Sequence, residues 1–185
     1  MSNRQIFVAG TWGSVKAEPY REEAVRLGML LARSGFDLAC GPGTGIARHV
    51  VDGYRSVEDR GTVRYYLPSE EHMVAVGEKV EPGADDIVTT DFDYPMRNVF
   101  QVSQCVGLFV ITGGDGTLEE ILPAVIDYGL PVAMIRGSGS AATALEALLE
   151  IYPDWSSLVA IGDSVDDLYP SWSARAEGRS GCEIP

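Results

Sequence analysis

The sequence predicts an α/β fold in which a parallel, doubly wound sheet of about seven strands carries helices on both faces. Two observations support it. Short apolar runs alternate with longer helical patterns along nearly all of the 185 residues. Glycine-rich turns directly follow three of the apolar runs, as in βα units. A chain of this length can bury one core without metal or disulfide support, so we expect a single domain.

Each element follows from its residues. Apolar runs bounded by turn residues predict strands at residues 6–9, 36–40, 63–67, 87–90, 106–111, 131–135 and 158–161. Apolar positions at helical spacing predict helices at residues 18–34, 46–54, 96–105, 118–128, 141–150 and 165–176. In the first helix Leu27 and Leu31 share one face, and Gly35 ends it. The domain should span residues 1–176, and residues 177–185 should form a frayed tail.

Charge and cysteine content exclude several classes of protein. The net charge of -13 argues against a nucleic-acid or anionic membrane surface, which needs clustered Lys and Arg. We interpret Cys40 and Cys105 as small core residues and Cys182 as a free thiol near the tail. The sequence shows neither a signal peptide nor an apolar run of membrane-spanning length, so we expect a cytoplasmic protein.

The segment T-G-G-D-G-T-L-E-E at residues 112–120 is the strongest functional signal. It joins an apolar strand to a helix that should begin at Gly116 or Thr117. Its glycines allow a ligand close to the backbone, and the N–H groups of the new helix favour an anion such as phosphate. Glycine loops at residues 10–14 and 41–45 should lie at the same edge of the sheet. Together they predict a nucleotide-sized ligand, with Gly10, Thr11, Gly41, Gly43 and Thr44 as further binding residues.

Other common sites are poorly supported. Neither a P-loop nor a dinucleotide-binding glycine pattern is present. The two histidines, His49 and His72, are far apart and lack partners at metal-ligand spacing; we interpret them as a helix-surface and a loop residue. Asp85 and Asp86 resemble solvated turn acids. We therefore expect no metal and no organic cofactor.

Three charged residues are candidates for chemistry. Arg97 starts the helix before the motif strand, where its guanidinium can hold phosphate or ribose oxygens. The alternative is an exposed arginine paired with Asp91 or Asp93. Glu119 and Glu120 either stabilise the start of their helix or place a carboxylate beside a sugar attached to the bound phosphate.

These motifs resemble a known family. C-G-P-G-T-G-I-A, followed by M-R-N and T-G-G-D-G-T-L-E-E, is similar to the LONELY GUY family and its superfamily, which includes nucleoside 5′-monophosphate phosphoribohydrolases. Arg97 matches the family's Arg, and the family pattern P-G-G-x-G-T-x-x-E is matched at Gly113, Gly114, Gly116, Thr117 and Glu120. Thr112 replaces the family's Pro and Asn98 its Lys, which is closer to the branch of molybdenum-cofactor carrier proteins.

The resemblance implies a Rossmann-like fold, a function and an assembly. Arg97 and Glu120 would be the catalytic pair of a hydrolase that splits a nucleoside 5′-monophosphate into free base and ribose 5-phosphate. The phosphate would bind at residues 113–117, and Asn98 and Glu119 would contact the substrate. The alternative is a non-catalytic carrier of a nucleotide or of a pterin-like molybdenum cofactor on the same loops. Members of the family are commonly dimers, so we expect a homodimer with the apolar helix at residues 96–105 near its interface.

Overall fold

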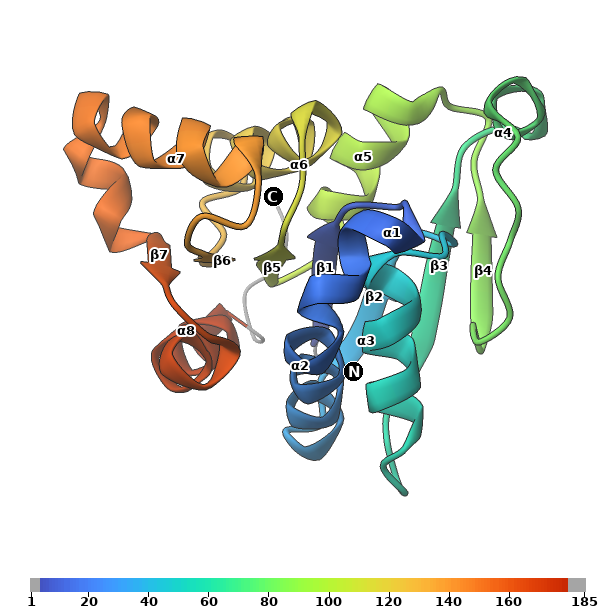
Figure 1. Cartoon of the computed structure of the whole chain (residues 1–185), viewed down its shortest axis with the longest axis horizontal. Helices are drawn as coiled ribbons and strands as arrows, with labels where there is room; N and C mark the ends of the chain where they lie inside the picture. The colour runs from blue at the N-terminus through green and yellow to red at the C-terminus, as the bar shows by residue number, and fades with distance from the viewer. Residues whose placement is uncertain (1–3, 180–185) are drawn as a thin grey trace.

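The computed structural model describes residues 4–179 and confirms the predicted fold class. All seven strands are parallel, in the order β4-β3-β2-β1-β5-β6-β7 (Figure 1). The strands are β1 (Gln5–Gly10), β2 (Asp37–Cys40), β3 (Val63–Leu67), β4 (Asp86–Thr89), β5 (Gly107–Ile111), β6 (Val132–Ile135) and β7 (Val159–Gly162). The apolar runs of the sequence therefore become strands of one sheet.

Helices cover both faces of this sheet. The helices are α1 (Ser14–Ala17), α2 (Arg21–Arg33), α3 (Ile46–Arg55), α4 (Glu70–Val76), α5 (Tyr94–Ser103), α6 (Asp115–Ile126), α7 (Ser140–Ile151) and α8 (Val165–Arg179), with short 3₁₀ helices η1 (Glu18–Tyr20) and η2 (Pro153–Ser157). In Figure 1, α2, α3 and α8 lie below the sheet, and α5, α6 and α7 lie above it. The layers are thus those of a doubly wound fold.

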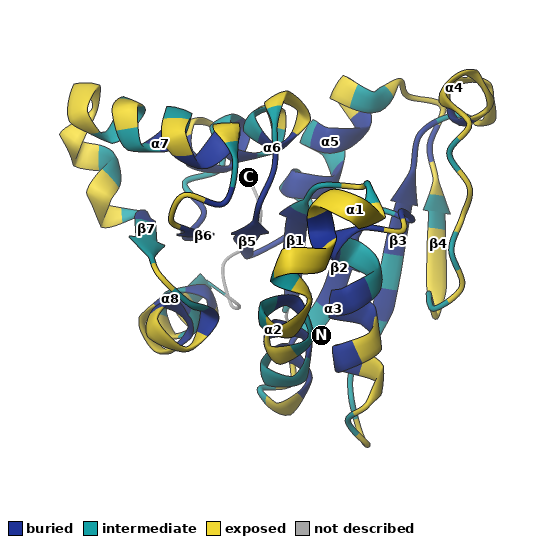
Figure 2. Ribbon diagram, in the orientation of Figure 1, coloured by how far each residue is buried: buried dark blue, intermediate teal, exposed yellow. Residues whose placement is uncertain are grey.

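Two apolar cores follow from the alternation of side chains along the strands. Ile6 and Val8 of β1 belong to the core between the sheet and helices α2, α3 and α8. Phe7 and Ala9 belong to the core on the opposite face, between the sheet and helices α5, α6 and α7. Because successive strand residues point to opposite faces, continuous apolar strands are required when both faces are covered. Figure 2 shows β1, β5 and β6 at the buried centre of the molecule, whereas the edge strand β4 is largely exposed.

The strand order places a crevice beside β1. The chain runs from β1 outward through β2 and β3 to β4, then returns to β5 on the other side of β1. Gly10 at the end of β1 is paired with Ile111 at the end of β5. Ligands of doubly wound proteins bind at such a switch point, outside the carboxyl ends of the strands.

Several element boundaries differ from the predictions. The helix expected at residues 18–34 is divided into η1 and α2, with Pro19 in η1, and the short helix α1 precedes it. Proline is tolerated in a first helical turn but not in a helix interior, which explains the division. Helix α6 begins at Asp115, one residue before Gly116, the earlier of its two expected starts. Helix α8 extends to Arg179, whose guanidinium donates to the carbonyls of Gly129 and Tyr128, while Cys182 lies outside the described residues.

Helix α4 has no counterpart among the predicted elements. Its start is marked by Ser69, whose carbonyl accepts hydrogen bonds from His72 and Met73. Gly77 ends it in the left-handed conformation, with a φ of 68°. His72 therefore lies in a helix and not in a loop. The helix escaped prediction because it is short and leaves Val74 and Val76 exposed, so no apolar face marks it.

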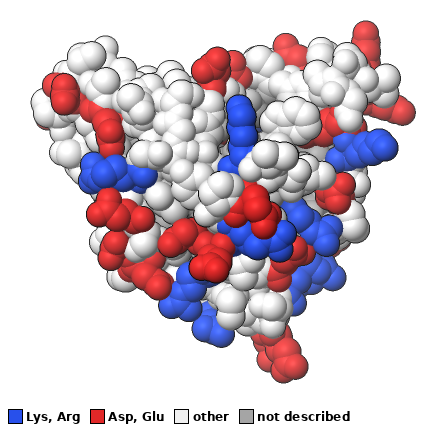
Figure 3. Space-filling view, in the orientation of Figure 1, with Lys and Arg blue, Asp and Glu red and all other residues white. Residues whose placement is uncertain are grey.

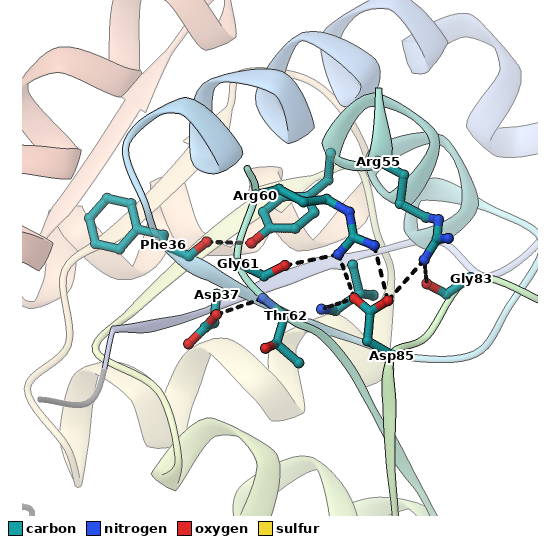
Figure 4. A network of polar contacts seen from close by, with 10 residues as sticks. Phe36, Asp37, Arg55, Arg60, Gly61, Thr62, Gly83 and Asp85 are labelled. Carbon is teal, nitrogen blue, oxygen red and sulfur yellow. Dashed lines mark hydrogen bonds and ion pairs between the residues drawn. The ribbon is translucent and has the colours of Figure 1, made fainter. Parts of the chain in front are cut away.

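Asp85 is not merely solvated, as the sequence suggested. It accepts hydrogen bonds from Arg60 and Arg55 and from the backbone N–H of Val63 (Figure 4). The hydrogen bonds from Arg60 lower the pKa of Asp85 to about 2. This network joins the amino-terminal ends of β3 and β4, at the edge of the sheet opposite the glycine loops. It therefore stabilises the scaffold and takes no part in the candidate site.

Candidate functional site

A cavity of about 390 Å³ opens at the carboxyl end of β1, at the switch point of the sheet. It is bounded by the three glycine loops, by the starts of α5 and α6, and by α1. Its lining comprises Phe7, Val8, Ala9, Gly10, Thr11, Trp12, Lys16, Gly41, Gly43, Ala47, Glu78, Tyr94, Arg97, Asn98, Gly114, Asp115, Gly116, Thr117, Glu119 and Glu120. The structure thus brings together eleven of the thirteen predicted site residues. The other two, Thr44 and Gly113, do not line the cavity.

The first two glycine loops pack against each other through their backbones. A Cβ atom at Gly10 would collide with the carbonyl of Ile111, and one at Gly45 would collide with the carbonyl of Thr11. The N–H of Ile46 donates to the Thr11 carbonyl at 3.0 Å. Thr44 turns its hydroxyl to the carbonyl of Trp12 and so supports this contact. Glycine is needed here for close approach of two chain segments.

The third loop presents the start of α6 to the cavity. A Cβ atom at Gly113 would collide with the side chain of Thr117, so this glycine serves packing. Gly114 and Gly116 line the cavity, and a Cβ atom at Gly116 would meet nothing within 4 Å. The start of α6, whose first N–H groups lack partners within the helix, therefore borders a space that an anion can enter.

Thr112 has a backbone conformation that is rare for its residue type. Its φ is 54°, in the left-handed region that β-branched residues avoid. Its N–H donates to the hydroxyl of Ser138 at 3.1 Å. A proline, with φ near -65° and no N–H, cannot adopt this arrangement. The departure from the family pattern at this position thus has a structural consequence.

Arg97 is buried at the base of the cavity, with 6% of its surface exposed. Its Nη1 donates to the carbonyl of Tyr66 at 3.1 Å and to Oε1 of Gln101 at 3.2 Å. The guanidinium lies 5.4 Å from the centre of the Tyr94 ring, while its buried Nε has no partner among the described residues. The alternative of an exposed arginine paired with an acid is wrong, because Asp93 instead caps α5 through the N–H of Met96.

Glu120 lines the same cavity as Arg97 and has a perturbed carboxyl group. Burial raises its pKa to about 7; the charge of Arg97 opposes this rise, and that of Glu119 adds to it. Asn98 donates from Nδ2 to Glu119 at 3.5 Å, and its buried Oδ1 has no partner among the described residues. A carboxyl group that titrates near neutral pH inside a cleft is a feature of functional sites.

Besides Asp115 of the motif loop, the cavity has three polar residues that were not predicted as site residues: Lys16, Glu78 and Tyr94. Lys16 lies on α1, in a stretch to which no element was assigned, and among the described residues it has no ion pair. Tyr94 donates its hydroxyl to Glu78 at 2.7 Å, and burial raises the pKa of Tyr94. Glu78 follows α4. No local motif marks these residues, because they meet only through the fold.

The histidines lie outside the cavity. His49 is 5% exposed on α3 and was wrongly placed on a helix surface. Burial lowers its pKa, and its Nε2 lies 3.7 Å from Glu18. Among residues 4–179 no group of three or more His, Cys, Asp or Glu side chains is arranged to hold a metal ion. In the same part of the chain, no helix is both long and apolar enough to cross a membrane.

The fold and the cavity define a doubly wound α/β protein with a ligand-sized site at its switch point. The chain belongs to the SLOG cluster4 family, which it matches over residues 3–158. This assignment confirms the resemblance to the LONELY GUY superfamily. No curated protein matches the sequence.

Several solved structures are similar to the whole chain. The crystal structure of TM1055 shares 28% identity, with a TM-score of 0.70 over 87% of this chain and 92% of that one. The molybdenum cofactor binding protein of the phototrophic bacterium Rippkaea orientalis shares 23% identity, with a TM-score of 0.72 over 90% and 93%. The molybdenum cofactor carrier protein of Chlamydomonas reinhardtii shares 21%, with a TM-score of 0.71 over 96% of both chains. At these identities the two cofactor proteins establish a common fold.

Proposed function

We propose that this protein hydrolyses the N-glycosidic bond of a nucleoside 5′-monophosphate, releasing the free base and ribose 5-phosphate. The observation that carries the proposal is the position of Glu120. Its perturbed carboxyl group lies in the same cavity as Arg97 and the open start of α6. A helix start that favours an anion and a carboxyl group with a raised pKa thus line one cavity.

The phosphate binds at the start of α6. Gly114, Asp115 and Gly116 line the cavity at the start of α6, where the first N–H groups lack partners within the helix and the helix dipole favours negative charge. Lys16 supplies a further cation from α1. Arg97 is held by Tyr66 and Gln101, so its guanidinium is fixed in place to orient the sugar phosphate. This arrangement compensates locally for the acidity of the whole chain.

The reaction then uses Glu120. Cleavage of the C1′–N bond builds positive charge on the ribose ring, which a carboxylate beside the ring stabilises. Glu120 accepts a proton from the attacking water, whose oxygen bonds to C1′, and the departing base takes up a proton on its nitrogen. Glu119, one position earlier on α6, lies beside Asn98 and contacts the ribose.

Incubation of the purified protein with nucleoside 5′-monophosphates, followed by chromatography of the released base, tests this proposal. Glu120→Gln and Arg97→Ala should each lower kcat by about 10²- to 10⁴-fold. Glu58→Gln, at an exposed carboxylate far from the cavity, is the matched control and should retain full activity. Full turnover by either site variant contradicts the assigned roles.

A carrier function is the second candidate. Thr112 and Asn98 depart from the hydrolase pattern, and the φ of Thr112 excludes the family's proline from this loop conformation. Two proteins of the same fold are named as binding or carrying the molybdenum cofactor. Under this alternative, a nucleotide or pterin stays bound through purification and is released unchanged on denaturation, as mass spectrometry would detect.

We also propose a homodimer that works in the cytoplasm, a location that the free thiols of Cys40 and Cys105 favour. The apolar helix suggested as the interface is α5. Val102 is fully buried in its own subunit, whereas Met96 is 54% exposed and remains free for a partner. Light scattering at micromolar concentration should give twice the monomer mass, and Met96→Asp should reduce it. A monomeric mass for the unchanged protein contradicts this proposal.

A further inference from the structure

We propose that Glu78 and Trp12 form a base subsite that selects a ring with two adjacent N–H donors. Such a pair of donors is the 2-amino-4-oxopyrimidine edge that guanine and pterins share. The inference rests on the proposed function, since it places a base beyond the phosphate and the ribose. It concerns the residues that decide which ligand the site accepts.

The position of Glu78 suits the far end of a nucleotide. The start of α6 follows β5, whereas Glu78 follows β3 and α4. In the sheet β5 and β3 are separated by β1 and β2, and three strand spacings of about 4.8 Å give about 14 Å. Both ends line the same cavity. An extended mononucleotide can therefore reach from the anion site to Glu78.

Glu78 is held with acceptor capacity to spare. Its N–H donates to the carbonyl of Met73 at 3.0 Å, just after Gly77 ends α4. Its Oε2 accepts the hydroxyl of Tyr94 at 2.7 Å, and within residues 4–179 its Oε1 has no hydrogen-bond partner. A carboxylate offers about four acceptor positions and no donor. Tyr94 thus orients the carboxylate and leaves acceptor positions open for a ligand.

This acceptor distinguishes the common bases by their edges. Guanine presents N1–H and the 2-amino group side by side, so both can donate to one carboxylate. Adenine and cytosine each place a ring-nitrogen acceptor beside the amino donor, and that acceptor would face a negative oxygen. Hydrogen bonds to a charged group are stronger than neutral ones, so the difference in affinity is large.

Trp12 supplies a flat surface in the same cavity as this acceptor. Its indole is 66% exposed yet lines the cavity. The residue is fixed by the loop at 41–45, where a Cβ atom at Gly43 would lie 3.3 Å from Cβ of Trp12. The same loop holds the segment after α4, because the N–H of Glu81 donates to the carbonyl of Pro42 at 3.0 Å. Ring stacking on Trp12 is tolerant of base identity, which leaves the choice to Glu78.

The test compares four nucleotides and one pterin. Base release from GMP, IMP, AMP and CMP gives kcat/KM, and calorimetric titration with GMP, AMP and 6-hydroxymethylpterin gives affinity. GMP should exceed AMP by at least about tenfold, and IMP, which lacks the 2-amino group, should be intermediate. Glu78→Gln should abolish this preference, whereas Glu71→Gln, an exposed glutamate of α4, should preserve it. Trp12→Ala should weaken all ligands to a similar degree.

The outcomes separate this inference from the proposed function. Base release from every nucleotide with no preference for GMP, or a preference unchanged in Glu78→Gln, overturns the inference and leaves the hydrolase standing. Absence of base release contradicts the hydrolase, and the titrations then still test Glu78. The subsite is supported if GMP or the pterin binds and Glu78→Gln weakens that binding. It is overturned if AMP binds equally well or if no ligand binds. Retention of the pterin together with no turnover of GMP identifies the pterin as the ligand.

Discussion

Replacement of Glu120 by Gln should make the protein more stable at alkaline pH while abolishing its activity. The cause is the cost of keeping this carboxylate charged in a cavity. Its pKa rises from 4.5 to about 7 on folding, chiefly through burial. Each tenfold change in proton affinity corresponds to about 1.4 kcal/mol, so the charged form costs about 3 kcal/mol relative to the unfolded chain.

The sign of the pH dependence follows from the raised pKa. Below pH 4.5 the carboxyl group is protonated in both the folded and the unfolded protein, so it costs nothing. Between pH 4.5 and about 7 the unfolded chain loses its proton first, and the free energy of unfolding falls. Above about 7 the full cost of about 3 kcal/mol is present. Glu120→Gln removes this term, so its benefit should appear only as the pH rises.

Thermal unfolding at pH 5 and pH 8, followed by circular dichroism, measures the effect. For a chain of this size, about 3 kcal/mol corresponds to an increase in Tm of about 6–12 °C at pH 8. At pH 5 the variant and the unchanged protein should differ little. Glu58→Gln, at an exposed side chain, should show the same difference from the unchanged protein at both pH values. Equal pH dependence of Tm with and without Glu120 would refute the reasoning.

Three further predictions concern activity and the motif loop. The value of kcat/KM should rise with pH and reach a plateau above about 7, because the charged form of Glu120 accepts a proton and the protonated form does not. A value that falls with pH would instead identify Glu120 as a general acid. Thr112→Pro, which introduces the family's residue, should lower the free energy of unfolding by about 3 kcal/mol in urea titrations. The reason is that proline cannot adopt a φ of 54° and has no N–H to donate to Ser138. Unchanged stability contradicts the described loop. Lys16→Ala should raise KM several-fold and weaken its salt dependence with kcat unchanged. An unaltered KM would remove Lys16 from the ligand site.

The alternation of apolar runs and helical patterns was sufficient to predict the strands and most of the helices. The inner strands β5 and β6 are buried on both faces, so their residues are apolar without interruption, and this signal is local. The edge strand β4 is largely exposed and gives a weaker signal. The motif loop was equally readable, because Gly114 directly precedes α6 and Gly116 lies in its first turn, and together they leave the start of that helix open to the cavity. Short helices such as α4 were missed, because seven residues with exposed valines carry too little periodicity.

Tertiary structure alone decided the environment of each charged group. Arg97 and Glu120 were recognisable as candidates, but the burial that raises the pKa of Glu120 results from packing between α5 and α6. Lys16, Glu78 and Tyr94 belong to three distant segments that meet because β1 lies at the centre of the sheet and β3 and β5 on its two sides. Local sequence fixes the hydrogen bonding and periodicity of one element at a time. Strand order, and with it the set of side chains around a cavity, results from the burial of all elements in common cores.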